Sequence, residues 1–229
     1  ATLGARYLLR KIGLRRTARL VTRVGGLATV GSALFFRAPH RVTPQQSGLE
    51  VAPADGTIAA IDTAAPPPEL GLDSVPRPRI SIFLSLLDVH VQRIPIDGLV
   101  TARAYRPGRF FSADLDKASE DNERNSLVIT PTAPVGQLVV TQIAGLLARR
   151  IVCDVDTGSP VLAGATYGLI RFGSRVDTYL PVGAVPLVRV GQRAVGGETV
   201  FADLSGGTRS GSPSASGAAP VPDPVPAGS

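Results

Sequence analysis

The side chains that most often carry metal or cofactor chemistry are scarce in this sequence. Its 229 residues include one cysteine and two histidines, and neither methionine nor tryptophan. The lone Cys153 excludes an internal disulfide, and its apolar surroundings, RRIVCDV, predict a buried thiol in a reducing compartment. So few histidines and cysteines argue against a zinc site. Neither G-x-G-x-x-G nor a Walker sequence occurs, so no nucleotide site is indicated.

Acidic residues are absent from the first part of the chain. Residues 1–49 hold nine basic residues and no acid, whereas residues 50–229 hold fifteen basic and eighteen acidic residues, so the two parts carry +9 and −3. A basic excess confined to a terminal arm argues against a nucleic-acid-binding domain and favours contact with an anionic surface. An anionic membrane is the leading candidate.

An uncharged apolar stretch, VGGLATVGSALFF over residues 24–36, interrupts the basic arm. It is shorter than the about 20 apolar residues that cross a bilayer as a helix. The pattern instead predicts a helical arm that lies in the membrane interface, with arginines at lipid phosphates. The alternative is a buried core helix with a solvated basic flank.

Beyond the arm, short runs rich in Val, Ile, Thr and Tyr are broken by Gly, Pro or Asp, which predicts a mainly β domain with a minor helical part. The charged segment over residues 112–125 predicts a loop or short helix. After Leu204 the composition is dominated by Gly, Ser, Ala and Pro, which predicts a disordered tail. We therefore expect an arm over residues 1–49, a β-rich domain over 50–204 and a tail over 205–229.

One internal repeat is present in the second half of the chain. Residues 158–166 and 191–199 share the pattern G-x-x-[AV]-x-x-G-x-T, which predicts two related hairpins in a sandwich-like or barrel-like fold. Such turns resemble those of lipoyl-like and biotinyl-like domains, where a lysine at a hairpin tip carries the cofactor. The only lysines here are Lys11, in the arm, and Lys117, in the charged segment. A carrier function is therefore disfavoured.

The stretch GLIRFGSRVDTYLP, residues 168–181, places Gly173 and Ser174 between two strand-like runs. Gly-Ser is an ordinary turn dipeptide, but its serine is also a candidate nucleophile. A Ser-His-Asp hydrolase could combine Ser174 with His90 and one of Asp55 or Asp88. Against this, the G-x-S-x-G nucleophile elbow is absent.

His90 is nearly the only histidine available for acid–base chemistry. The alternation in LLDVHVQRIP predicts a strand with Asp88, His90 and Gln92 on one face. A histidine on a strand is often a hydrogen-bonded structural residue, and this role is the alternative to catalysis. Asp88 is predicted to hold the end of that strand. His40, just past the apolar arm, is expected at the surface.

Five motifs follow one another between roughly residues 34 and 204. They are VAPADG (51–56), DVHVQRIP (88–95), NERN (122–125), GLLARRIV (145–152) and YGLIRFGSRVDTYLP (167–181). Together they resemble phosphatidylserine decarboxylases, and more narrowly the short prokaryotic form found in actinobacteria. The resemblance implies pyruvoyl-dependent decarboxylation of phosphatidylserine to phosphatidylethanolamine.

The same resemblance implies that the bond between Gly173 and Ser174 cuts itself. Ser174 Oγ would attack the Gly173 carbonyl, elimination would leave dehydroalanine, and hydrolysis would give a pyruvoyl group at residue 174. This ketone replaces pyridoxal phosphate as the electron sink, which agrees with the scarcity of lysine. The products would be a large chain, 1–173, and a small chain, 174–229.

The resemblance also implies roles for single residues. Asp55 would orient His90, and His90 would take the proton of Ser174, by the logic of other triads. His90 could later protonate the carbanion, but some family members carry a second histidine where this chain has Arg93. Whether His90 serves both steps is therefore open. Candidate ligands for the lipid phosphate are Arg149, Arg150 and Arg175, and no metal is expected.

Two other functions stay open at this point. A serine hydrolase would use Asp55, His90 and Ser174 without self-cleavage. A non-enzymatic lipid-surface binding module of lipoyl-like fold would use the Gly-Ser pair only as a turn. The resemblance favours the decarboxylase, associated with the cytoplasmic face of the cell membrane as a heterodimer of the two self-cleaved chains, with higher oligomers possible and no nucleic-acid partner.

Overall fold

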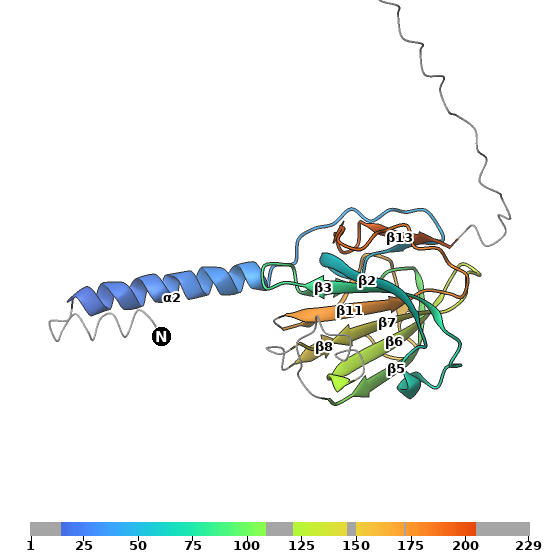
Figure 1. The fold of residues 1–229 in the computed structure, drawn as a ribbon. Helices are drawn as coiled ribbons and strands as arrows, with labels where there is room; N and C mark the ends of the chain where they lie inside the picture. Colours follow the sequence, from blue (N-terminus) through green and yellow to red (C-terminus); the bar gives the residue numbers. More distant parts are fainter. Residues whose placement is uncertain (1–14, 109–120, 146–149, 172, 205–229) are drawn as a thin grey trace, which may run out of the picture.

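The computed structural model describes residues 15–108, 121–145, 150–171 and 173–204, and these ranges are mainly β, as predicted (Figure 1). Helix α2 (Arg15–Phe35) precedes the strands, and the short 3-10 helix η1 (Pro68–Leu70) lies between β2 and β3. The strands are β1 (Leu49–Val51), β2 (Gly56–Ala64), β3 (Arg77–Leu84), β4 (Val91–Arg93), β5 (Gly98–Arg106), β6 (Arg124–Pro131), β7 (Leu138–Ile143), β8 (Ile151–Cys153), β9 (Pro160–Val161), β10 (Thr166–Ile170), β11 (Ser174–Tyr179), β12 (Arg193–Ala194) and β13 (Val200–Asp203). The predicted tail, most of the charged segment and the first fourteen residues of the arm lie outside these ranges.

Most of the strands belong to one antiparallel sheet that curls into a half-barrel. Its order is β12-β2-β3-β11-β7-β6-β5-β9, and a three-stranded sheet β4-β10-β8 and a two-stranded sheet β1-β13 complete the fold. On β3 the alternate residues Ile80, Ile82 and Leu84 are fully buried in the core. Tyr167 of β10 and Phe201 of β13 belong to the same core cluster. All three sheets therefore share one core.

Strand β11 has a central place in the large sheet. It lies between β3 and β7, with Ser174 opposite Leu84 and Arg175 opposite Ile143. All six of its residues are buried, and alternation places Ser174 on one face and Arg175 on the other. The strand that starts at the predicted cleavage site is therefore hydrogen-bonded on both sides.

The two halves of the internal repeat occupy equivalent places in the fold. Their strands, β9 and β12, lie at the two ends of the large sheet. Gly164 and Gly197, which match in the repeat, both have left-handed backbone angles, with φ of 79° and 80°. A Cβ on Gly164 would clash with Thr43, in the segment that joins α2 to β1, and a Cβ on Gly197 would crowd the Arg93 side chain, so glycine allows close packing at both turns.

Helix α2 extends away from the β body (Figure 1). Leu20, Val24, Leu27 and Leu34 are each more than half exposed, so the alternative of a buried core helix is wrong for this part of the arm. Its last residue, Phe35, is buried. Among the helices in the described ranges, none combines the length and apolar character needed to span a membrane.

Candidate active site

The Ser174 side chain is completely buried at the first position of β11. Its Oγ atom has no hydrogen-bond partner among the described residues. Leaving a buried hydroxyl unsatisfied costs about 1–3 kcal/mol, so a serine with only a structural role is normally paired. This cost makes Ser174 a candidate for chemistry.

Gly173 supplies the turn that leads into β11. Its φ of 59° is left-handed, and a Cβ there would meet nothing within 4 Å. The backbone angle, and not a lack of space, is therefore what favours glycine.

His90 is oriented by a backbone carbonyl. Its ring is 2% exposed, and its Nδ1 lies 2.9 Å from the carbonyl oxygen of Asp88. A carbonyl can only accept, so Nδ1 carries the proton and Nε2 keeps its lone pair. Nε2 is buried without a partner among the described residues. Burial lowers the pKa of His90, and the guanidinium of Arg37 contributes in the same direction although the Asp88 carbonyl opposes it.

The end of α2 covers this histidine. The rings of Phe35 and His90 lie with centroids 4.2 Å apart, tilted by 36°. The phenyl ring excludes water from one face of the imidazole, which supports the neutral state of the histidine. The membrane-associating arm predicted from composition therefore ends directly on the candidate base.

Two backbone connections hold His90 and Ser174 at the same end of β3 and β11. Ser174 pairs with Leu84, and the turn of residues 85–88 leads from Leu84 towards His90. From the other side, the Ile170 amide donates to the His90 carbonyl at 3.2 Å, and four residues later the chain reaches Ser174. These connections lead a buried lone pair and a buried hydroxyl, each without a partner among the described residues, to the same end of the two strands.

The sequence prediction that Asp88 and His90 share a regular strand is wrong. β3 ends at Leu84 and β4 begins only at Val91. Between them the Asp88 carboxylate accepts hydrogen bonds from the backbone N–H and the hydroxyl of Ser85, at 2.8 and 2.7 Å, and closes a turn. This local pairing replaces the ladder hydrogen bonds of a strand.

Asp88 is structural, as predicted, but it closes the turn that follows β3 and does not hold the end of a strand that carries His90. Burial disfavours its charge, but hydrogen bonds from Arg193 and Ser85 outweigh burial and lower the pKa of Asp88. The carboxylate fixes the turn, and the backbone carbonyl of the same residue fixes the tautomer of His90. Asp88 is therefore a positioning residue whose main contribution sequence reasoning missed. The serine three residues before it was the available signal.

The Asp55 carboxylate is hydrogen-bonded to groups other than His90 in the described structure. One oxygen accepts from Arg41 at 2.7 Å and the other accepts from the Gly196 amide at 2.7 Å. No hydrogen bond joins Asp55 to His90 in the parts of the chain that are described, and the Asp88 carbonyl takes the Nδ1 position. The triad role of Asp55 stays a prediction.

The three predicted phosphate-binding arginines have different surroundings. Arg175 is buried, and its guanidinium donates to Asp177 at 2.6 Å and to the Ser81 hydroxyl at 2.7 Å. Arg150 is exposed, and Arg149 lies outside the described residues. Arg150 is thus the one of the three that the structure places at the surface.

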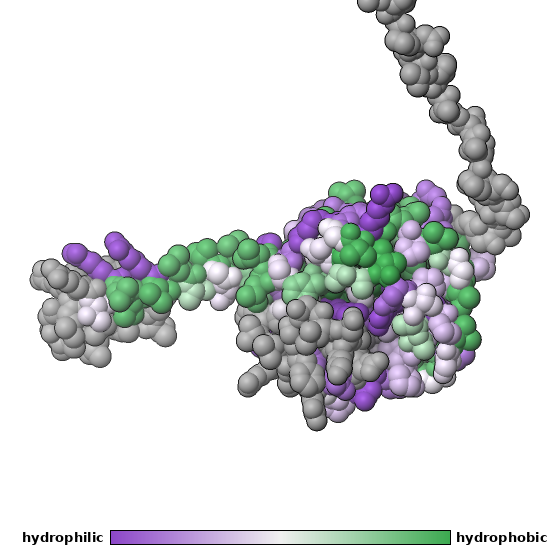
Figure 2. All heavy atoms as spheres, viewed as in Figure 1, coloured by the Kyte–Doolittle hydropathy of each residue, from purple (hydrophilic) through white to green (hydrophobic). Residues whose placement is uncertain are grey.

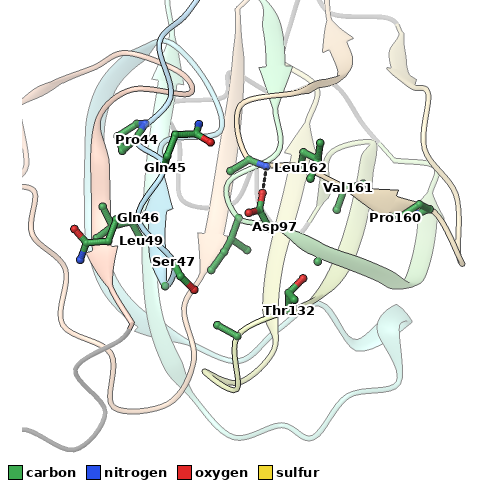
Figure 3. A pocket seen from close by; sticks show the side chains of 15 residues that line it. Pro44, Gln45, Gln46, Ser47, Leu49, Asp97, Thr132, Pro160, Val161 and Leu162 are labelled. Atoms are coloured by element: carbon green, nitrogen blue, oxygen red, sulfur yellow. Dashed lines mark hydrogen bonds between the residues drawn. The ribbon is translucent and has the colours of Figure 1, made fainter.

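Three other kinds of feature among the described residues could form a site: the single cysteine, a cluster of metal-binding side chains and a surface pocket. Cys153 is only partly buried, and its thiol donates to the Val155 carbonyl. No cluster of three or more His, Cys, Asp or Glu side chains that could hold a metal occurs within the described ranges. An open pocket of about 700 Å³ lies between residues 44–49 and 160–163, where Asp97 accepts from the Ala163 amide (Figure 3). None of the predicted site residues lines it.

Comparison with known proteins gives concordant matches over most of the chain. A family model described as phosphatidylserine decarboxylase matches residues 32–202. Three similar curated proteins each carry the name phosphatidylserine decarboxylase proenzyme. That of Saccharopolyspora erythraea is 57% identical over 84% of this chain and 81% of its own length. That of Mycobacterium marinum is 59% identical, covering 81% and 77%, and that of Granulibacter bethesdensis is 58% identical, covering 80% and 74%.

Proposed function

The chain belongs to the phosphatidylserine decarboxylase family, and we propose that it is a proenzyme that cuts itself between Gly173 and Ser174. As a member of this family it is a lyase that converts phosphatidylserine to phosphatidylethanolamine and carbon dioxide. The single observation that carries the proposed site is the pair of buried, unpartnered atoms, Ser174 Oγ and His90 Nε2, at one end of β11.

Self-cleavage begins with a proton transfer. His90 Nε2 takes the proton of Ser174 Oγ, and the oxygen attacks the Gly173 carbonyl carbon. The bond from that carbon to the Ser174 nitrogen then breaks, and His90 returns the proton to the nitrogen, so that an ester replaces the amide. Loss of the Ser174 Cα proton expels the Gly173 carboxylate and leaves dehydroalanine. Addition of water and release of ammonia leave a ketone, the pyruvoyl group.

The surroundings of the two residues suit this reaction. The lowered pKa of His90 keeps the base neutral, and the Asp88 carbonyl holds the proton on Nδ1 so that Nε2 is free to accept. The left-handed angle at Gly173 and the fixed start of β11 hold the scissile bond at a turn. Ser174, on the other side of the scissile bond, is completely buried, so its hydroxyl is shielded from water.

The closed corner around residue 174 also fits the group that self-cleavage would create. When formed at residue 174, a pyruvoyl group would supply a ketone as the electron sink for decarboxylation of the substrate amine. Because Ser174 is fully buried at the first position of β11, the new terminus would be held in place by β3 and β7. His90, once protonated at Nε2, would be the proton donor in this reaction.

The two products of cleavage would remain one body. The small chain would contribute β11, β12 and β13, and each pairs with strands of the large chain: β3 and β7, β2, and β1, respectively. These antiparallel ladders share the common core. A tightly bound heterodimer follows from this pairing.

Membrane association is the remaining part of the proposal. The exposed apolar side of α2 and the basic residues of the arm suit an anionic lipid surface. Contact with the cytoplasmic face agrees with the unpaired Cys153 and the absence of internal disulfides.

Two variants test the proposed chemistry. Ser174→Ala and His90→Gln should each leave an uncut chain on a denaturing gel and release no carbon dioxide from phosphatidylserine. Ser47→Ala, at an exposed position, is the matched control and should be cut and active. An uncut Ser174→Ala protein that decarboxylates the lipid would refute the proposal. A cut Ser174→Ala protein would show that the cleavage site is not between Gly173 and Ser174.

A further inference from the structure

Resting on the proposed function, we propose that the turn of residues 85–88 is a second membrane contact, separate from the arm. Its tip, Leu86 and Leu87, inserts into an anionic phospholipid surface. The β body is thereby seated on the bilayer with His90 and Ser174 close to the lipid headgroups.

The turn presents its apolar side chains to solvent and buries its polar one. Leu86 is 52% exposed and Leu87 is 85% exposed, whereas Asp88 is buried and bonded to Ser85. Two adjacent exposed leucines at the tip of a turn contribute little hydrophobic free energy to folding, because they bury little surface within the folded chain. They would gain contact area in a bilayer.

The tip adjoins the apolar side of α2. Arg37 donates from one guanidinium nitrogen to the Leu34 carbonyl at 2.6 Å and from the other to the Leu87 carbonyl at 3.1 Å. Leu34 and Phe36 are 56% and 50% exposed. The apolar surface of the helix reaches the β body at this junction (Figure 2). The helix end and the turn thus form one surface, defined by Leu34, Phe36, Leu86 and Leu87.

Cations border this surface. Arg37 is exposed, and the side chain of Arg193, which pairs with Asp88, is 60% exposed. The Asp88 carboxylate is only 6% exposed and is neutralised by that pair. An apolar tip between two arginines matches the layering of a phospholipid surface, with phosphates above acyl chains.

The position of the turn relative to the candidate active site also favours a phospholipid surface as its partner. Leu87 lies three residues before His90, and the Asp88 carbonyl between them orients the histidine. A substrate that resides in a bilayer has to bring its headgroup to His90 while its acyl chains remain in an apolar phase. Insertion of Leu86 and Leu87 would shorten that path.

The absence of tryptophan makes a direct test possible, because a single introduced tryptophan reports without background. Leu87→Trp, Leu27→Trp on α2 and Leu162→Trp would be mixed with phosphatidylglycerol vesicles carrying bromine on their acyl chains. Leu162 is 69% exposed and borders the pocket of Figure 3, so it is the matched control. We expect a blue shift and quenching for positions 87 and 27, and neither for position 162.

Because phosphatidylglycerol is not the substrate of the proposed reaction, this result is independent of decarboxylation. Unchanged emission from position 87 alongside quenching at position 27 would show that only the arm binds, and would overturn the inference. A blue shift at position 87 that grows with protein concentration without vesicles would also overturn it, because a second copy would then cover the turn.

A binding measurement complements the spectra. In flotation with the same vesicles, the double variant Leu86→Ser/Leu87→Ser should lose at least about tenfold in apparent affinity, given the area two leucines bury. The control Leu162→Ser should bind like the parent protein. Equal binding by the double variant would contradict the proposal.

Discussion

His90 illustrates how the surroundings of one residue decide its chemistry. An exposed imidazole exchanges its proton between two nitrogens, whereas the Asp88 carbonyl fixes the Nδ1–H form here. Burial beneath Phe35 favours the uncharged ring. The result is a neutral imidazole whose Nε2 lone pair has no partner among the described residues, which suits its proposed role as the base.

This state predicts the pH dependence of self-cleavage. The pKa of His90 is lowered from 6.5 by burial, so protonation abolishes the base only at lower pH than for an exposed histidine. The cleavage rate of freshly refolded precursor, followed on denaturing gels between about pH 5 and about pH 8, should be constant at the upper end. It should fall with a midpoint below 6.5. A midpoint above 6.5 would contradict a buried neutral histidine as the base.

A second test at the level of single residues concerns the role of Asp88 in positioning His90. Asp88→Ala leaves the partly buried amide and hydroxyl of Ser85 without their acceptor, at a cost of about 1 kcal/mol, and loosens the turn that carries the His90 partner. Self-cleavage should slow by roughly ten- to a hundredfold, with the Asn variant closer to the parent protein because its side-chain oxygen can still accept. The control Arg193→Met removes only the ion pair and should have a small effect, since the arginine is mostly exposed. Unaltered cleavage in Asp88→Ala would contradict the positioning role.

At the scale of helices, strands and turns, some features of the fold could be predicted from the sequence and others could not. The short runs rich in Val, Ile, Thr and Tyr predicted a mainly β domain, and the apolar stretch over residues 24–36 predicted a helical arm. In the structure this helix, α2, begins earlier, at Arg15. The turn at Asp88 was missed because a pairing between side chain and backbone three residues apart overrides a period of two. The partners of Asp55 come from the linker and from the second repeat, so no local pattern could reveal them.

Strand β1 contains a buried acid that predicts a measurable effect on stability. Glu50 is fully buried, its oxygens have no partner in the described structure, and burial raises its pKa well above 4.5. A raised folded-state pKa means that stability is intact below about 4.5 and is lost progressively as pH rises, because the unfolded chain ionises first. Glu50→Gln should therefore raise the melting temperature more at about pH 8 than at about pH 5. An equal gain at both pH values would contradict the burial of an uncompensated carboxyl group.

At the scale of the whole molecule, the proposed membrane-contacting side adjoins the proposed reaction site. The apolar side of α2 and the turn of residues 85–88 meet near the place where Phe35 covers His90. The charge asymmetry and five motifs predicted the arm and the family from sequence. The docking of the arm on the histidine could not be predicted, because Phe35 and His90 are far apart in sequence and only the fold brings them into contact.

The intact mass of the purified protein under denaturing conditions tests the central claim most directly. The account predicts a large chain that ends at Gly173 and a small chain, starting at residue 174, that is lighter by one ammonia than the same peptide with an ordinary serine terminus. A single uncut chain that still decarboxylates phosphatidylserine would contradict self-cleavage as the source of the catalytic group.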